Sequence, residues 1–94
     1  MIEPCKIHIH SPCWNEEFFL PFYLDHYKFV DRFFIYDNGS TDNTLDILSR
    51  NPKVTVIPYD TRNEIRDDVY LDIKNNRWKE YSSDCDWVIV CDID

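Results

Sequence analysis

Three aspartates stand at or just beyond the ends of apolar runs, at positions where a carboxylate could take part in chemistry. The run 33–36 leads to Asp37, and the run 87–91 leads to Asp92 and Asp94. Two carboxylates spaced D-x-D at a strand end offer hard oxygen ligands of the kind that Mg²⁺ or Mn²⁺ takes, with other positions left to water and phosphate oxygens. By itself a D-x-D is a weak signal, and solvated aspartates are the commoner occurrence.

The charge balance of the chain restricts its partners. Its 94 residues carry 18 acidic and 10 basic side chains, which gives a formal net charge of −8. Such a chain has no basic patch to neutralise phosphates, so nucleic acid and anionic membranes are not expected as partners. An anionic ligand would need an intervening cation, and a divalent ion held by carboxylates supplies one.

The elements that must position these aspartates follow from the apolar periodicity. Strands are predicted over 6–10, 32–37, 53–59 and 86–91, and helices over 15–30, 43–50 and 64–81. This alternation predicts one α/β domain over residues 1–94, with a parallel sheet, right-handed crossovers and helices on both faces. In such sheets ligands bind beyond the carboxyl ends of the strands, which is where this chain concentrates its carboxylates.

Local signals refine the first two helices. Asn15 is a candidate N-cap, and Pro21 requires that the first helix begins near Phe18 or is kinked. Gly39 permits a positive φ in the turn after the second strand. One of Ser40, Thr41 or Asp42 is expected to cap the second helix. The aromatic side chains around the first helix are expected to pack in the core or against another domain, rather than to form a ligand platform: Phe18, Phe19, Phe22, Tyr23, Tyr27 and Phe29.

The histidines and cysteines have a structural interpretation. His8 and His10 alternate with Ile7 and Ile9, so they are predicted on the opposite face of the first strand. A metal site with Cys13 is an alternative, but two histidines two apart are more often one face of a strand. The four cysteines form no C-x-x-C pair and are predicted to be buried, reduced thiols of a cytoplasmic protein. They are Cys5, Cys13, Cys85 and Cys91.

Neither a signal peptide nor a membrane span is predicted. The amino terminus lacks an apolar stretch of the required length, and no run approaches the ~20 apolar residues of a spanning helix. The chain is therefore expected in the cytoplasm, with membrane association left to parts that it does not contain.

Three segments, taken together, resemble the amino-terminal half of a family-2-like GT-A glycosyltransferase domain. They are PCWNEEFFLPFYLDHY (12–27), FFIYDNGSTDNTLDIL (33–48) and CDWVIVCDID (85–94). The resemblance implies a Rossmann-like half-domain with mainly parallel strands in the order 3-2-1-4. It also implies a nucleoside diphosphate sugar as donor, of the UDP type by preference, an acceptor that it does not identify, and Mn²⁺ or Mg²⁺ as cofactor.

The resemblance assigns nucleotide-binding roles to residues near the first two strands. Asp37 would contact the base or ribose, and Asn15 and Glu16, with the loop from Ser11, would line the same pocket. Structural roles remain alternatives for two of them. Asp37 could stabilise its own turn as an Asx residue, and Glu16 could be a first-turn helix acid.

The remaining assignments fall late in the chain. Asp92 would face the ribose or metal-bound water, and Asp94 would ligate the metal directly. Asn76 and Arg77 lie near the place of an Arg-Asn element that approaches the donor in such enzymes. A solvated helix residue or an ion pair is the alternative for Arg77.

Enzymes of this family continue well past the D-x-D, where the acceptor site and any general base lie. We therefore expect this chain to be a truncated, donor-binding half that does not transfer sugar by itself. The first alternative is a non-catalytic nucleotide-binding or assembly fragment. A nucleotidyltransferase is less favoured, because the loop SPCWNEE (11–17) is neither glycine-rich nor basic. A receiver-type signalling domain is disfavoured because Glu16 and Glu17 lie several residues beyond the first strand.

Overall fold

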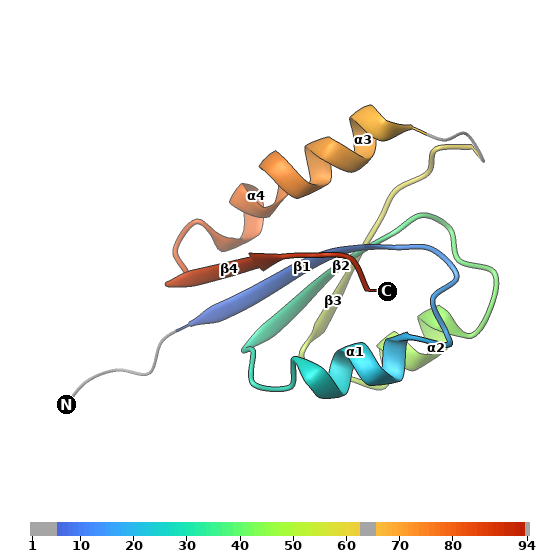
Figure 1. Cartoon of the computed structure of the whole chain (residues 1–94), viewed down its shortest axis with the longest axis horizontal. Helices are drawn as coiled ribbons and strands as arrows, with labels where there is room; N and C mark the ends of the chain where they lie inside the picture. Colours follow the sequence, from blue (N-terminus) through green and yellow to red (C-terminus); the bar gives the residue numbers. More distant parts are fainter. Residues whose placement is uncertain (1–5, 63–65, 94) are drawn as a thin grey trace.

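The computed structural model describes residues 6–62 and 66–93, which contain a four-stranded sheet (Figure 1). Its strands are parallel throughout and lie in the order β3-β2-β1-β4. The predicted α/β class, parallel pairing and strand order are therefore confirmed. The strands are β1 (Ile7–Cys13), β2 (Arg32–Asp37), β3 (Val54–Pro58) and β4 (Trp87–Val90).

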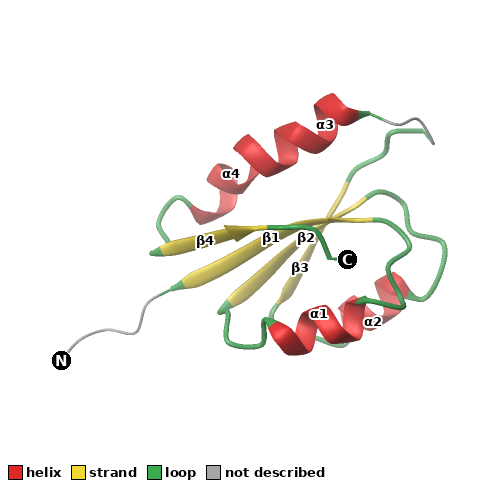
Figure 2. Cartoon of the chain, in the orientation of Figure 1, coloured by secondary structure: helices red, strands yellow, loops and turns green. Residues whose placement is uncertain are grey.

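Helices cover both faces of the sheet, as the sequence predicts (Figure 2). Helices α1 (Leu20–His26) and α2 (Thr44–Ser49) lie on one face. A continuous helical rod lies on the other, made of α3 (Asp67–Asp72), the π-helical turn η1 (Ile73–Arg77) and α4 (Trp78–Ser82). The rod corresponds to the helix predicted over 64–81, whose first two residues lie outside the described part of the chain. The π turn is a feature that the periodicity does not predict.

The larger hydrophobic core lies between the sheet and the α1–α2 layer. Alternate side chains of β1 and β2 enter it, including Ile9, Phe33 and Ile35, and each of them is fully buried. Leu20 and Leu48 complete it from α1 and α2. Because β1 and β2 lie inside the sheet and are covered on both faces, nearly every residue of these strands is buried, as expected of a parallel sheet.

A smaller core beneath the rod contains a buried polar network. His10 Nδ1 lies 2.8 Å from the Tyr36 hydroxyl, and the Ser82 hydroxyl lies 2.7 Å from both His10 Nε2 and His8 Nδ1. The His10 ring also stacks on Phe34 at 4.7 Å between centroids. The predicted faces of β1 are thus confirmed, and the histidines secure α4 to the sheet. Cys13 belongs to the opposite core, so this structure does not assemble the alternative His8–His10–Cys13 metal site.

The first helix departs from its prediction. It covers residues 20–26 rather than 15–30, and Pro21 lies in its first turn. Asn15 does not cap it, because Asn15 lies five residues earlier with φ of 48° in a turn tied to the β2–α2 loop. Tyr23 and Tyr27 pack on the core as predicted. Four neighbouring phenylalanines are exposed and do not pack in this core, so packing against another domain stays a prediction for them: Phe18, Phe19, Phe22 and Phe29.

Candidate functional site

The carboxyl ends of the strands place most of the predicted site residues at one edge of the sheet. Cys13 at the end of β1 is in register with Asp37 at the end of β2, and the Asn38 amide donates to the Cys13 carbonyl at 2.9 Å. On the other side of β1, the Cys91 amide just beyond β4 donates to the His10 carbonyl at 3.2 Å. From β1 the chain adds β2 and β3 on one side of the sheet and then β4 on the other side. In open α/β folds, ligands bind at the point where the strand order changes direction in this way.

Asp37 organises the turn that follows β2. Its carboxylate accepts hydrogen bonds from the Ser40 amide at 2.9 Å and from the Ser40 hydroxyl at 2.5 Å, and its side chain is almost fully buried. The turn passes through Gly39 at φ of 67°, which confirms the expected positive φ. The turn-stabilising alternative for Asp37 is therefore present. A carboxylate has about four acceptor positions, so the two Ser40 bonds leave capacity for a ligand.

The loop after β1 is fastened to the loop after β2. The Asn15 amide donates to the Ser40 hydroxyl at 2.9 Å, and the Asn15 carboxamide oxygen accepts from the Thr41 amide at 2.7 Å. The Glu16 amide donates to the Thr44 hydroxyl at 2.9 Å. The structure thus brings Asn15 and Glu16 beside the Asp37 turn, as the nucleotide-site hypothesis requires. Their alternative roles as N-cap and first-turn helix acid do not apply, because α1 begins only at Leu20.

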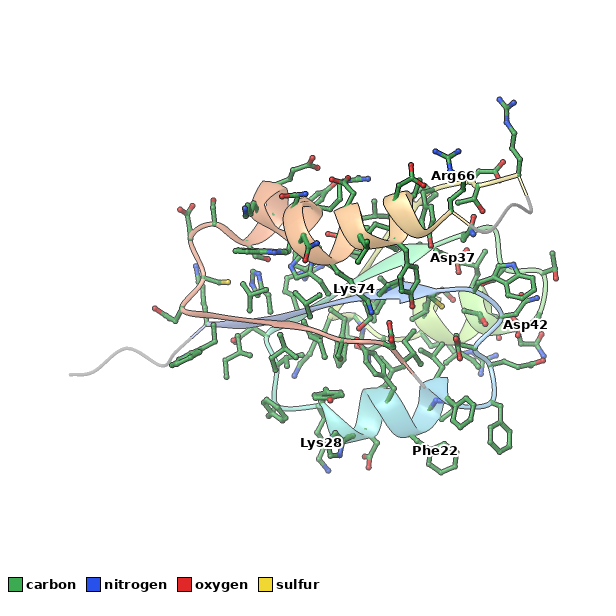
Figure 3. All side chains as sticks on the ribbon, turned by 45° about the horizontal axis from the view of Figure 1, so that its top comes forward. Phe22, Lys28, Asp37, Asp42, Arg66 and Lys74 are labelled. Atoms are coloured by element: carbon green, nitrogen blue, oxygen red, sulfur yellow. The ribbon has the colours of Figure 1, made fainter. Side chains whose placement is uncertain are left out.

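The predicted N-cap of α2 is wrong: the helix begins at Thr44, its N-cap residue is Asn43 rather than Ser40, Thr41 or Asp42, and the Asn43 side chain makes no capping bond. Asp42 accepts a hydrogen bond from the Thr44 amide at 2.9 Å, which satisfies one of the amides left free at a helix start. Hydrogen bonding to Thr44 and to nearby backbone amides outweighs the effect of burial and lowers the pKa of Asp42. Figure 3 shows Asp37 and Asp42 toward the same end of the sheet.

Ser11 faces the interior instead of the edge. It is fully buried, and its hydroxyl lies 2.6 Å from the Tyr23 hydroxyl of α1. Burial raises the pKa of Tyr23 well above its usual range, so this phenol stays neutral. The Ser11 side chain therefore joins β1 to α1. The predicted loop from Ser11 is wrong, because β1 continues to Cys13 and the loop at the candidate site begins at Trp14.

Asp92 lies at the predicted position after β4, where two side chains of the rod already hold it. Its Oδ1 atom accepts a hydrogen bond from the Tyr70 hydroxyl at 2.6 Å and lies 2.9 Å from the Lys74 ammonium. The Tyr70 hydrogen bond, and then the Lys74 ammonium, hold the pKa of this carboxyl below its usual range. Asp94, the predicted direct metal ligand, lies outside the described residues.

Arg77 lies about one helical turn along the rod from Lys74 and away from the carboxyl edge. Its guanidinium lies 5.7 Å from the centroid of the Tyr36 ring, and its Nε atom is 3.5 Å from Glu80 Oε2. The ion-pair alternative for Arg77 is thus present in the structure. The structure does not bring Arg77 next to Asp92; Lys74 takes that place.

The described residues hold no group of three or more His, Cys, Asp or Glu side chains that could ligate one metal ion. Of the two predicted metal ligands, Asp92 and Asp94, the structure describes only Asp92. It is 40% exposed at the strand end, and its Oδ1 already contacts a cationic ammonium group. Mg²⁺ and Mn²⁺ sites of this kind use only one or two carboxylates, with water and substrate phosphates supplying the other ligands. In that arrangement Asp92 and Asp94 would hold the ion.

A cavity of about 470 Å³ opens on the α1 face. Aromatic side chains in and beside α1 line it, together with Asp92 and Ile93. Asp37 and Asn15 do not line this cavity, so it meets the carboxyl edge only at Asp92 and Ile93. Its aromatic lining is Phe19, Phe22, Tyr23, His26 and Tyr27.

Lys74 and Tyr70 were not among the predicted site residues. Both lie on the face of the rod that meets the sheet edge, four residues apart, so helical spacing could have placed them together. Their position over Asp92 depends on the crossover to β4 and on the π turn, which carry no clear sequence signal. The pairing of Asn38 with Thr61 was not predicted either. The Asn38 carboxamide donates to the Thr61 hydroxyl at 2.9 Å and accepts from the Thr61 backbone amide at 3.0 Å, which joins the loops after β2 and β3.

No protein-family model matches the chain, and the search of curated proteins finds no match. No helix in the described part of the chain has the length and apolarity needed to cross a bilayer.

Proposed function

We propose that this chain forms the donor-binding half of a glycosyltransferase and binds a nucleoside diphosphate sugar, with a UDP sugar favoured. The observation that carries the proposal is the arrangement of residues around the carboxyl end of β1. Asp37 ends β2 on one side, Asp92 follows β4 on the other, and the Asn15–Glu16 loop crosses between β1 and α1. Ligands of open parallel sheets bind at this kind of reversal point.

The hydrogen bonds between the loops at this edge support the proposal that the nucleotide pocket is formed before the nucleotide binds. Because Asn15 and Glu16 are hydrogen-bonded to residues 40–44, the two loops form one unit rather than two independent segments. Asp37 anchors that unit through Ser40 and retains acceptor capacity for a base or ribose hydroxyl. Preformed loops lower the entropy cost of binding a nucleotide.

The acidity of the site accounts for the proposed cofactor. A nucleoside diphosphate is anionic, and the chain carries a net charge of −8, so direct binding would be opposed by repulsion. A bound Mn²⁺ or Mg²⁺ would bridge carboxylate and diphosphate and stabilise the nucleoside diphosphate as it leaves the anomeric carbon. Asp92, with Asp94, would position the ion, while the unit of Asn15, Glu16 and Asp37 would hold the nucleoside.

The proposal predicts metal-dependent nucleotide binding that depends on Asp92. Calorimetric titration of UDP into the protein should give binding in the presence of Mn²⁺ and much weaker binding without it. Asp92→Asn should weaken the Mn²⁺-dependent binding about tenfold or more, because it removes a charged ligand of the ion. Asp94→Ala should have a similar effect, and the same titration measures it.

Asp84→Asn is the matched control, because Asp84 is an exposed carboxylate in the turn before β4, at the opposite edge of the sheet. It should bind UDP and Mn²⁺ as the wild type does. Folded wild-type protein that binds no nucleoside diphosphate with Mn²⁺ would overturn the proposal. Titration of other nucleoside diphosphates then identifies the preferred base.

A non-catalytic assembly module is the second candidate, and the exposed phenylalanines favour it. Phe18, Phe19 and Phe22 lie together, with ring centroids 5.0 and 6.3 Å from Phe18, and large exposed apolar groups often mark interaction surfaces. This candidate would be supported over the first if the folded chain binds no nucleotide in the presence of Mn²⁺ and self-associates in sedimentation experiments.

A further inference from the structure

We infer that a second binding site lies at the amino edge of the sheet and takes a small anionic amphiphile, an apolar molecule that bears one carboxylate or phosphate group. The feature behind it is a cavity of about 400 Å³, lined by residues of α1, α2, the start of β2 and the segment before β3. Because β2 and β3 begin here, the cavity lies at the edge opposite the candidate nucleotide site. Figure 3 shows Lys28, one of its lining residues, away from Asp37 and Asp42.

The floor of the cavity is apolar. Leu24 of α1 and Ile47 of α2 are half-buried there and pack against the larger core, to which the fully buried Phe33 belongs. An apolar group in the cavity would remove this half-buried surface from water, which favours binding. The cavity volume also falls in the range of small-molecule sites, which is about 300–1,000 Å³.

The rim of the cavity is cationic, in contrast to the chain as a whole. Of the described residues that line it, three are positively charged and none is acidic, although the chain has 18 acidic and 10 basic side chains. The three are Lys28, Arg50 and Lys53. An apolar floor beside three positive charges is complementary to a ligand that joins an apolar group to an anion.

Lys53 is held at the rim by the backbone. Its ammonium donates to the carbonyls of Lys28 and Val30 at 2.8 and 3.0 Å. These bonds use two of the three N–H groups of an ammonium and bring no negative charge to it. Lys53 can therefore donate to an anion without giving up its place.

The other two cations have carboxylate partners that a ligand can replace or join. Arg50 Nη2 lies 2.6 Å from Asp46 Oδ2, and Lys28 Nζ lies 3.7 Å from Asp25 Oδ1. Both pairs are well exposed, and exposed pairs of this kind contribute little. A guanidinium also has five N–H groups, so Arg50 can bind Asp46 and a ligand anion together.

The ligand is assigned as a free molecule rather than as part of a membrane. An anionic bilayer would face the wider surface of a chain with a net charge of −8, which opposes its approach. A small anion reaches the cavity alone, where the lining is cationic.

The test titrates octanoate into the protein and follows the backbone amide signals by nuclear magnetic resonance. Octanoate should bind saturably and shift the signals of residues around the cavity. Acetate lacks the apolar chain and octanol lacks the charge, so both should bind much more weakly. Octyl phosphate in the same titration shows which of the two anionic groups the site prefers.

The variants test whether the cationic rim binds the anion. Arg50→Gln should weaken octanoate binding about threefold, the effect expected for one exposed charge pair, and Arg50→Lys should restore most of the affinity. Lys79→Gln is the matched control, because it removes the same charge from an exposed position on α4, which lies on the other face of the sheet. It should bind octanoate as the wild type does.

The inference is overturned if octanoate does not bind, or if Arg50→Gln binds it as tightly as Lys79→Gln does. It is also overturned if the shifts gather around the exposed phenylalanines instead of the cavity. Octanol that binds as tightly as octanoate would overturn the anionic class of the ligand. Cosedimentation of the protein with phosphatidylglycerol vesicles would overturn its assignment as a free molecule.

Discussion

His10 shows how a single residue can link stability to pH in this protein. Its ring is completely buried, stacked on Phe34 and hydrogen-bonded at both nitrogens to Tyr36 and Ser82. Burial, with a smaller contribution from neighbouring His8, lowers the pKa of His10 to about 4. Burial also lowers the pKa of His8. Both histidines are therefore neutral in the folded protein at neutral pH.

The protein should lose stability as the pH falls from about 7.5 to about 5. The unfolded chain takes up protons at its histidines near the ordinary pKa of about 6.5, whereas folded His10 does so only near 4. The contribution of His10 is therefore complete above the unfolded value and is lost as the pH drops toward the folded one. The expected loss of unfolding free energy is about 2 kcal/mol by pH 5, measured by urea denaturation.

Replacing the buried histidine should remove most of this pH dependence. His10→Gln is expected to be less stable than the wild type, but its unfolding free energy should change less between the two pH values. His26→Gln, at an exposed position on α1, should show the same change of unfolding free energy with pH as the wild type. If the unfolding free energies of the wild type and His10→Gln change equally with pH, the folded protein protonates His10 as easily as the unfolded chain does.

The candidate site residues were predictable from the sequence to different degrees. Asp37, Asn15 and Glu16 follow a strand end or precede a helix, so local pattern was enough to place them at one edge. Lys74 was not predictable, because its contact with Asp92 joins positions 18 residues apart across a crossover. The bond from Ser11 to Tyr23 was missed for a similar reason, since a serine near a strand end has no marker of which way its side chain points.

At the scale of elements, α1 is the clearest departure from the periodicity. Apolar positions 20, 23, 24 and 27 recur at helical spacing, and the structure packs them on the core. The predicted start of the helix is wrong because residues 15–17 bond to the segment between β2 and α2, and such side chain–backbone bonds compete with helix formation. The phenylalanines outside this face project from the core, as Phe22 does in Figure 3.

Substitutions in α1 should affect stability differently on its buried face and on its exposed face. Leu20→Ala should cost about 2–5 kcal/mol of unfolding free energy, because Leu20 is fully buried in the larger core. Phe22→Ala should change stability by about 0.5 kcal/mol or less, because Phe22 is 69% exposed. Denaturant unfolding measures both. A large loss in Phe22→Ala would mean that this ring is covered in solution, for example by a second molecule.

The topology of the whole molecule was the most predictable feature. Alternating strands and helices allow few arrangements, since parallel strands need helical crossovers of one hand. The resemblance then selected the order 3-2-1-4, which the structure confirms. The π turn and the exposed phenylalanines were not predictable, because they reflect how separate elements meet rather than the pattern within one of them.

The net charge of −8 leads to a prediction for the molecule as a whole. Excess negative charge destabilises a compact chain through self-repulsion. The ion pairs on its surface offset this only weakly, because pairs such as Asp46–Arg50 and Asp68–Arg66 are well exposed.

Raising sodium chloride from about 0.01 to about 0.1 M shortens the screening length from about 30 to about 10 Å. This weakens the long-range repulsion more than it weakens the attraction within ion pairs, whose charges are about 3 Å apart. The urea midpoint should therefore rise with salt in this range, at constant pH. A midpoint that falls would mean that the surface ion pairs, rather than the net charge, dominate the electrostatic contribution to stability.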